Sequence, residues 1–170
     1  IPDDVSDEDA VFTVISSIGL QGMRLLNPTY GENVIVFGLG LVGLITIQLL
    51  KANGINVIGV DIDEKKCKIA KDLGIDSLNP KTDDVEGRIM HLTNDVGVDG
   101  VIITAASKSD EIIATSAKIC RKKGRIILVG VIGLNINRDD FYEKELTFQV
   151  SCSYGPGRYD YKYEEEGIDY

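Results

Sequence analysis

Three glycines near residue 40 have the spacing needed to bring a diphosphate against bare main chain. They form a Gly-x-Gly-x-x-Gly pattern after the apolar residues 34–37, and a long apolar stretch at helical spacing follows. The turn and the first helical residues are Gly38, Gly40, Leu41, Val42 and Gly43. Gly38 permits a tight turn, Gly40 lets the backbone approach phosphates, and Gly43 lets the helix pack close to the strand. Free N–H groups and the positive end of the helix dipole would then face the anion.

An aspartate strengthens this interpretation, because the glycine spacing alone arises easily by chance in a chain with 18 glycines. A second apolar run, residues 57–60, ends on Asp61, about 20 residues beyond the glycines. A carboxylate there accepts hydrogen bonds from both hydroxyls of an adenosine ribose and repels the extra phosphate of NADP. The pattern therefore predicts NAD(H) as the cofactor. The alternative is an ordinary helix cap at Asp61 or Asp63.

Other residues are predicted to complete this site. Ile62 and Lys66 follow Asp61, and Lys66 would lie beside the adenosine ribose unless it is simply a solvated helix residue. The small residues Thr104, Ala105 and Ala106 leave a predicted strand, where they make space for the nicotinamide and its ribose. A plain strand-to-helix turn explains these three residues equally well. Gly130 and Val131 leave the next strand, and their backbone would hold the carboxamide.

Alternating strands and helices are expected to position these residues. The pattern predicts an α/β fold, a doubly wound parallel sheet (Rossmann) with strand order 3-2-1-4-5-6 and an N-terminal helical extension at residues 6–27. The predicted strands are residues 34–37, 57–60, 77–78, 101–104, 126–129 and 146–150. The later helices are predicted at 41–52, 64–73, from Thr82 or Asp83 to about 94, and 109–119, the last ending in basic residues 121–123. The ligand crevice is expected at the carboxyl ends of the first and fourth strands.

Bulk composition excludes several other classes of protein. The 170 residues are 44% hydrophobic and 26% charged, as in a globular domain, and the net charge of −9 disfavours nucleic acid and anionic membranes as partners. Cys67, Cys120 and Cys152 have no paired spacing and His91 is the only histidine, so we expect no zinc in this fragment and a reduced, cytoplasmic setting. The acidic start at Ile1 is not a signal peptide and lacks an initiator methionine, which indicates a piece of a longer protein.

Residues 6 to 150 resemble the cofactor domain of the medium-chain, zinc-type alcohol dehydrogenase superfamily. The resemblance lies in Ile18-Gly19-Leu20-Gln21-Gly22, residues 33–43, Asp61, Asp99-Gly100-Val101-Ile102-Ile103 and residues 123–130. It implies an NAD-dependent oxidoreductase acting on CH–OH groups of an alcohol, polyol or sugar, and a homodimer formed through an edge near residues 134–137. The third family ligand for catalytic zinc would fall near Thr13, where there is no Cys, Asp or Glu.

Residues 151–170 form a tail rich in Tyr and Glu, which we separate from a dinucleotide-binding domain at 1–150. Together with 142–146, this tail is similar to bi-domain oxidoreductases, in which such a dehydrogenase half is fused to a half of the glucose-fructose oxidoreductase type. The catalytic region would then be missing here, the small-molecule substrate would belong to the full-length protein, and the fragment alone would be inactive. Two other classes are open: a regulatory domain that senses NAD without catalysis, and an adenosylmethionine methyltransferase, although Phe37 and residues 104–106 do not fit the latter.

Overall fold

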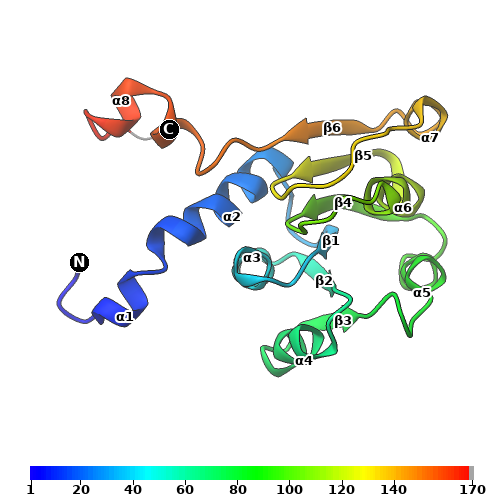
Figure 1. Ribbon diagram of the computed structural model, residues 1–170, viewed down its shortest axis with the longest axis horizontal. Helices are drawn as coiled ribbons and strands as arrows, with labels where there is room; N and C mark the ends of the chain where they lie inside the picture. The colour runs from blue at the N-terminus through cyan, green and yellow to red at the C-terminus, as the bar shows by residue number, and fades with distance from the viewer. Residues whose placement is uncertain (169–170) are drawn as a thin grey trace.

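A parallel six-stranded sheet forms the centre of the protein, in the computed structural model that describes residues 1–168 (Figure 1). Its strand order is β3-β2-β1-β4-β5-β6, so the predicted order is confirmed. The strands are β1 (Asn33–Phe37), β2 (Asn56–Val60), β3 (Asp76–Leu78), β4 (Val98–Ile103), β5 (Cys120–Leu128) and β6 (Thr147–Val150). Every neighbouring pair is parallel.

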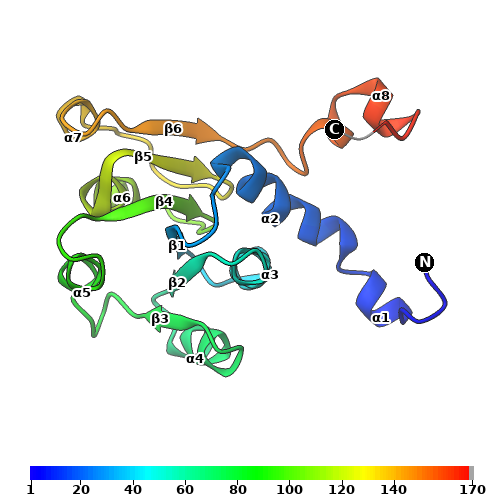
Figure 2. The same ribbon diagram turned by 180° about the vertical axis from the view of Figure 1, so that it is seen from behind.

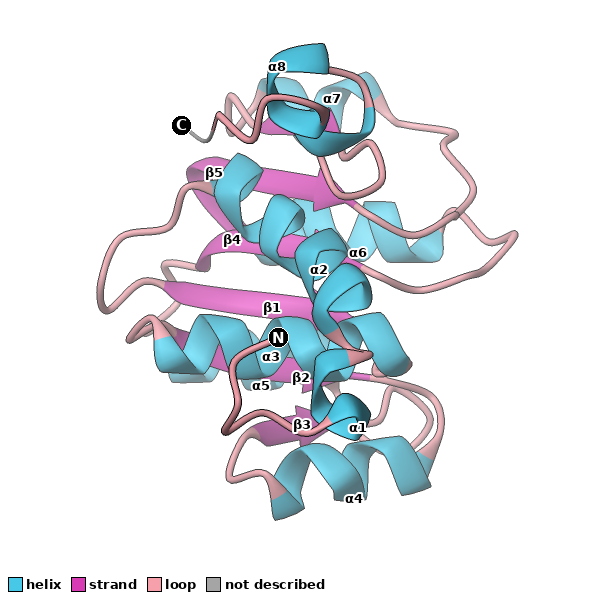
Figure 3. Ribbon diagram, turned by 90° about the vertical axis from the view of Figure 1, so that its left-hand side faces the viewer, coloured by secondary structure: helices cyan, strands magenta, loops and turns pink. Residues whose placement is uncertain are grey.

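Helices cover both faces of the sheet. The helices are α1 (Asp7–Ala10), α2 (Thr13–Leu26), α3 (Leu41–Ala52), α4 (Glu64–Asp72), α5 (Val85–Leu92), α6 (Glu111–Ile119), α7 (Arg138–Tyr142) and α8 (Tyr161–Glu164), with the 3-10 turn η1 (Pro156–Arg158). Figure 3 shows α2, α3 and α4 on one face, where they bury Leu26, Ile47 and Ala70. On the other face α5 and α6 bury Ile89 and Ile113. Both faces of the strands are therefore apolar, which explains their continuous hydrophobic runs.

The central position of β1 creates the place for a site. Its neighbours are β2 on one side and β4 on the other, paired as Phe37 with Val60 and Phe37 with Ile103 at their carboxyl ends. The chain leaves β1 and β2 toward helices on one face, and leaves β4 toward α6 on the other. Such a divergence opens a crevice at the carboxyl edge of the sheet.

The N-terminal extension differs from the single helix predicted at 6–27. Ser6 caps the first helix, since its hydroxyl accepts a hydrogen bond from the Asp9 amide at 3.1 Å. The helix then breaks at residues 11–12 and restarts as α2. Because α1 buries no residue, no tertiary packing keeps it in line with α2. Gly19 and Gly22 lie away from the break, and a Cβ on either would come within 2.7 Å of Thr46 or Val129, so they serve close packing.

Two other local predictions were wrong. The first residue of α5 follows Asp84, whose carboxylate accepts from the Gly87 amide at 3.0 Å, whereas Asp83 bonds back to the Asn79 amide. The basic residues 121–123 belong to β5 and do not end α6. A lysine distant in sequence takes that place, because the Lys144 ammonium donates to the carbonyls of residues 117, 118 and 120.

The helices α1 and α8 extend beyond the carboxyl edge of the sheet. Figures 1 and 2 show α1 and α8 on this same side of the molecule, away from the strands. The tail includes η1 and α8, neither of which buries a residue, and Tyr170 of the predicted tail lies outside the described residues. Over residues 1–168, no helix has the length and apolarity required to cross a membrane.

Candidate functional site

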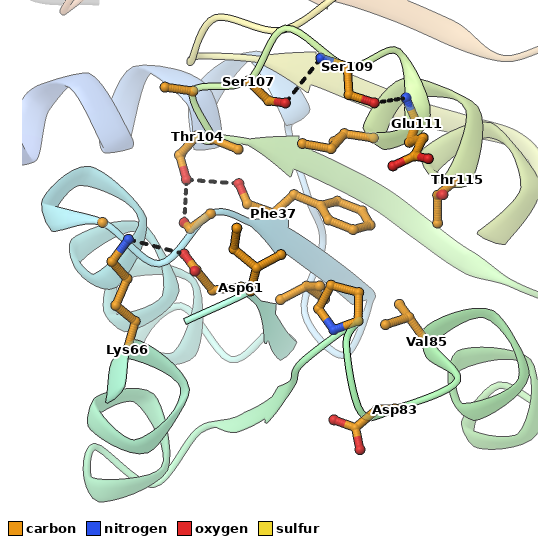
Figure 4. A pocket seen from close by; sticks show the side chains of 18 of the residues that line it. Phe37, Asp61, Lys66, Asp83, Val85, Thr104, Ser107, Ser109, Glu111 and Thr115 are labelled. Carbon is orange, nitrogen blue, oxygen red and sulfur yellow. Dashed lines mark hydrogen bonds and ion pairs between the residues drawn. The ribbon is translucent and has the colours of Figure 1, made fainter. Parts of the chain in front are cut away.

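A cleft of about 730 Å³ opens at the carboxyl ends of β1, β2 and β4 (Figure 4). The structure brings together most of the predicted site residues there. Those that line the cleft are Gly38, Gly40, Asp61, Ile62, Lys66, Thr104, Ala105 and Ala106. The other five, Leu41, Val42, Gly43, Gly130 and Val131, are not among the residues that line it. The cleft thus combines segments that are more than 60 residues apart in sequence, such as Gly38 and Thr104 (66 apart).

Two of the three glycines are required by the protein's own packing. Gly38 has φ +94°, and a Cβ on it would lie 2.6 Å from the backbone N and Cα of Ala105. A Cβ on Gly43 would overlap the carbonyl oxygen of Gly38. The turn between β1 and α3 can therefore close only with glycine at both positions.

Gly40 is different, because nothing in the protein requires a glycine there. Its φ of −70° and ψ of −171° are open to any residue, and a Cβ built on it meets nothing within 4 Å. The residue is exposed and lines the cleft. The absence of a side chain at this point leaves room for a ligand to approach the main chain closely.

The backbone amides around Gly40 differ in whether the protein itself provides an acceptor. Gly38 donates its N–H to the Val60 carbonyl at 2.8 Å, and Leu44 donates to the Gly40 carbonyl at 2.8 Å. For the amide of Gly40, which is the N-cap of α3, and for the amides of residues 41–43, which begin the helix, no acceptor is found among the described residues. An α-helix leaves such amides free at its start, and together with the helix dipole they attract an anion.

Asp61 lies directly beside the glycine turn. One carboxylate oxygen, Oδ2, accepts from the Leu39 amide at 2.7 Å, and Oδ1 accepts from the Asp63 amide at 2.9 Å. The Lys66 ammonium is 3.7 Å from Oδ2 (Figure 4). The Asp61 side chain is only 7% exposed, whereas that of Lys66 is 42% exposed. Asp61 is thus an anchor of the turn as well as a carboxylate at the cleft, whereas the helix cap considered as the alternative is provided by Asp63, whose Oδ1 accepts from the Lys65 amide at 2.9 Å.

The backbone of Asp61 is fixed from behind by α4 and β3. The Cys67 thiol donates to the Asp61 carbonyl at 3.3 Å, and the Ser77 hydroxyl donates to the Cys67 carbonyl at 2.8 Å. Burial is the main cause that raises the pKa of the Cys67 thiol. The thiol therefore stays protonated and acts as a donor here.

Thr104 turns its hydroxyl toward the glycine turn. Its Oγ1 lies 2.6 Å from the Gly38 carbonyl oxygen and 3.1 Å from that of Phe37. The next segment, after β5, lies alongside: Ala106 and Val131 form a parallel bridge, and a Cβ on Gly130 would overlap the Ala105 carbonyl. Gly130 is therefore explained by packing between the two loops, while Val131 as a whole residue is 74% exposed.

The far part of the cleft carries residues that sequence reasoning missed. Carboxylates line it at Asp83, Asp84, Glu86 and Glu111. Their presence follows from topology, since the segment after β3 and the start of α6 both meet the carboxyl edge of the sheet. The only sequence sign was the position of residues 79–86 after the predicted third strand. Lys66 is the one cation among the residues of the lining.

The described residues do not by themselves provide a set of zinc ligands. No group of three or more His, Cys, Asp or Glu side chains is arranged to hold a metal ion between residues 1 and 168. Near the position expected for a ligand, the Thr13 hydroxyl donates to the Ala10 carbonyl at 2.7 Å. His91 is exposed on α5, away from the cleft lining.

Comparison with known proteins identifies the family of this chain. The sequence profile of the family described as "Zinc-binding dehydrogenase" matches residues 42–166. The chain belongs to this family. The alcohol dehydrogenase of Geobacillus stearothermophilus is 33% identical over 133 residues, and the D-guloside 3-dehydrogenase of Escherichia coli K12 is 34% identical over 161 residues. These matches cover 77% and 90% of this chain.

Solved structures of other dehydrogenases share the fold. The 2R,3R-butanediol dehydrogenase of Bacillus subtilis superposes with a TM-score of 0.83 at 24% identity, over 100% of this chain and 50% of its own. An Escherichia coli CFT073 alcohol dehydrogenase complexed with NADH superposes with a TM-score of 0.80 at 23% identity, over 98% of this chain and 50% of its own. The chain spans only 38% and 45% of the two curated relatives, so it corresponds to less than half of such a zinc-binding dehydrogenase.

Proposed function

We propose that this chain is the NAD(H)-binding part of a dehydrogenase that oxidises or reduces a small alcohol, polyol or sugar. Bound NAD would supply the hydride chemistry, and this part of the protein would hold and orient it. The free amides of residues 40–43 would receive the pyrophosphate, and Asp61 the adenosine ribose. Lys66 would lie beside that ribose, and Ile62 would face the adenine. The loops at residues 104–106 and 130–131 would border the nicotinamide.

The observation that carries this proposal is the glycine at position 40. Gly40 needs neither an unusual φ nor close packing, and it stands where the free amides meet the cleft. A ligand that presses against the main chain gives this glycine a reason, and a pyrophosphate has the charge that the amides attract. Family membership and the NADH complex of a neighbour with the same fold favour a dinucleotide as that ligand.

The charges of the cleft favour NAD over NADP. Asp61 and the far carboxylates would repel an added phosphate on the adenosine ribose, and Lys66 is already directed at Asp61. The catalytic residues and substrate pocket of the whole protein would lie in the part that this chain does not contain. No step through zinc is assigned to the residues present.

We further propose that residues 1–150 act as the dinucleotide-binding domain and that residues 151–170 lead toward the catalytic part. The likeness of the tail to bi-domain oxidoreductases supports a second oxidoreductase half in the full-length protein.

The three free thiols, of which Cys67 and Cys120 are buried, favour a reducing compartment such as the cytoplasm.

Gly40→Asn tests the proposal without disturbing the fold. Asn is preferred at a helix N-cap at least as well as glycine, and the position is open, so thermal stability should be equal or higher. The Asn side chain would fill the approach to the amides and bond to one of them. We expect the wild type to bind NAD more tightly than NADP by calorimetry, and Gly40→Asn to lose about tenfold or more in NAD affinity.

Two results would contradict the proposal. Tighter binding of NADP than of NAD would remove the role of Asp61. Unchanged NAD affinity in a folded Gly40→Asn protein would mean that no ligand approaches the main chain at this point.

A further inference from the structure

We propose that Thr104 is a positioning residue for the anion-binding turn: its hydroxyl holds the Gly38–Leu39 peptide in the one orientation that accepts a diphosphate. This role rests on the proposed function. It differs from leaving space for the nicotinamide and its ribose, which was the role expected for Thr104 from sequence.

The contacts of Thr104 point to the turn and not to open space. Its amide donates to the Phe37 carbonyl at 2.8 Å, which continues the pairing of β4 with β1. Its hydroxyl has a single proton, and the shorter of its two contacts is with the Gly38 carbonyl, at 2.6 Å against 3.1 Å for Phe37. The hydroxyl therefore donates to the peptide that links Gly38 to Leu39 (Figure 4).

The amide of the same peptide is held from β2, which lies on the other side of β1 from β4. The Leu39 amide donates to Asp61 Oδ2 at 2.7 Å, and the Leu39 side chain is fully buried. Thr104 follows β4 and Asp61 follows β2, the two neighbours of β1. The peptide is thus clamped at its carbonyl by one neighbouring strand and at its amide by the other.

A clamp matters at this peptide because glycine alone would not fix it. Because Gly38 has no Cβ, its φ and ψ are both little restricted, so the peptide plane after it is free to rotate unless other groups hold it. In the observed orientation the Gly38 carbonyl faces Thr104 and the start of α3, where a Cβ on Gly43 would overlap it. Rotation would turn this carbonyl, with its negative partial charge, away from its donor and displace the free amides that follow.

The test compares two ligands and three variants. Thr104→Val keeps the shape and removes the hydroxyl, Thr104→Ala removes it without adding bulk, and Thr104→Ser restores it. ADP carries the diphosphate but no nicotinamide ribose, and adenosine carries neither. Affinities are measured by calorimetry for ADP and by NMR titration for adenosine, with thermal unfolding as a check of folding.

We expect Thr104→Val and Thr104→Ala to bind ADP about tenfold more weakly than the wild type, with adenosine affinity within about twofold. Thr104→Ser should bind ADP like the wild type. If Thr104→Val does not fold, Thr104→Ala gives the same comparison.

Other outcomes overturn the clamp. Unchanged ADP affinity in both variants that lack the hydroxyl refutes it, and so does an equal loss for ADP and adenosine, which would indicate general damage to the cleft. Failure of the wild type to bind either ADP or NAD refutes the proposed function itself and the clamp with it. The wild-type measurement therefore separates the two failures.

Discussion

Replacing Asp61 should reduce stability and cofactor selectivity together. Its carboxylate accepts two backbone amides, at 2.7 and 2.9 Å, with a side chain that is only 7% exposed. Hydrogen bonds to a charged acceptor contribute about 1.5–3 kcal/mol each. Asp61→Ser removes both bonds, so we expect the free energy of unfolding to fall by about 3 kcal/mol. Asp61→Asn keeps one carbonyl acceptor and should lose roughly half as much.

The same substitutions should change the preference for NAD. Asp61→Ser removes the acceptor for the ribose hydroxyls and the repulsion of a 2′-phosphate, and it frees Lys66, whose ammonium lies 3.7 Å from Asp61. We expect NAD affinity to fall about tenfold or more, NADP affinity to fall less or to rise, and the ratio between them to narrow by about tenfold.

Urea unfolding and calorimetry on the same variants separate the two roles of Asp61. A narrowed NAD preference with unchanged stability would refute its role as an anchor of the turn. A loss of stability with an unchanged ratio of the two affinities would show that the carboxylate serves the fold alone.

Two further predictions test the packing of the turn and the burial of a thiol. Gly38→Ala should lower the free energy of unfolding by about 2 kcal/mol or more, because it adds a clash with Ala105 to the strain of a positive φ. Gly31→Ala is the control for strain alone, because Gly31 has φ +82° and no neighbour within 4 Å. An equal loss of stability in both variants would rule out the clash. Burial raises the pKa of Cys120 from 9.0 to about 12, so the folded protein keeps this proton to higher pH than the unfolded chain. The stability that this protonated thiol contributes is complete below pH 9 and is lost toward pH 12, at up to about 1.4 kcal/mol per pH unit. Cys120→Ala should therefore remove this part of the decrease in unfolding free energy with pH, measured by urea unfolding at pH 8–11. An unchanged dependence on pH would contradict the raised pKa of Cys120.

The main features of the fold follow from local sequence patterns. Apolar runs broken by glycines define β1, β2 and α3, and the alternation of strands with helices leads to the observed strand order. Gly38, Gly40 and Asp61 line one cleft as a consequence, since the carboxyl ends of parallel strands share an edge. These predictions rest on periodicity and on short spacings, which the sequence displays directly.

Side-chain partners from distant segments could not be predicted in this way. The Lys144 ammonium at the end of α6 replaces the basic residues 121–123 that the sequence places there. The Thr104 hydroxyl points to a carbonyl 66 residues away. Each of these hydrogen bonds forms because the fold brings together two groups that both need a partner, and no spacing in the sequence predicts such a pair.

The glycine motif itself combines two kinds of requirement that sequence cannot separate. Gly38 and Gly43 are needed because a Cβ would meet Ala105 or the Gly38 carbonyl, so the folded chain alone accounts for them. Gly40 meets nothing and has an ordinary φ, so the folded chain does not account for it. Two of the three glycines would therefore be expected even in a protein of this fold that binds no nucleotide. Gly40 is the glycine that indicates a ligand, and Gly40→Asn is the substitution that separates binding from folding.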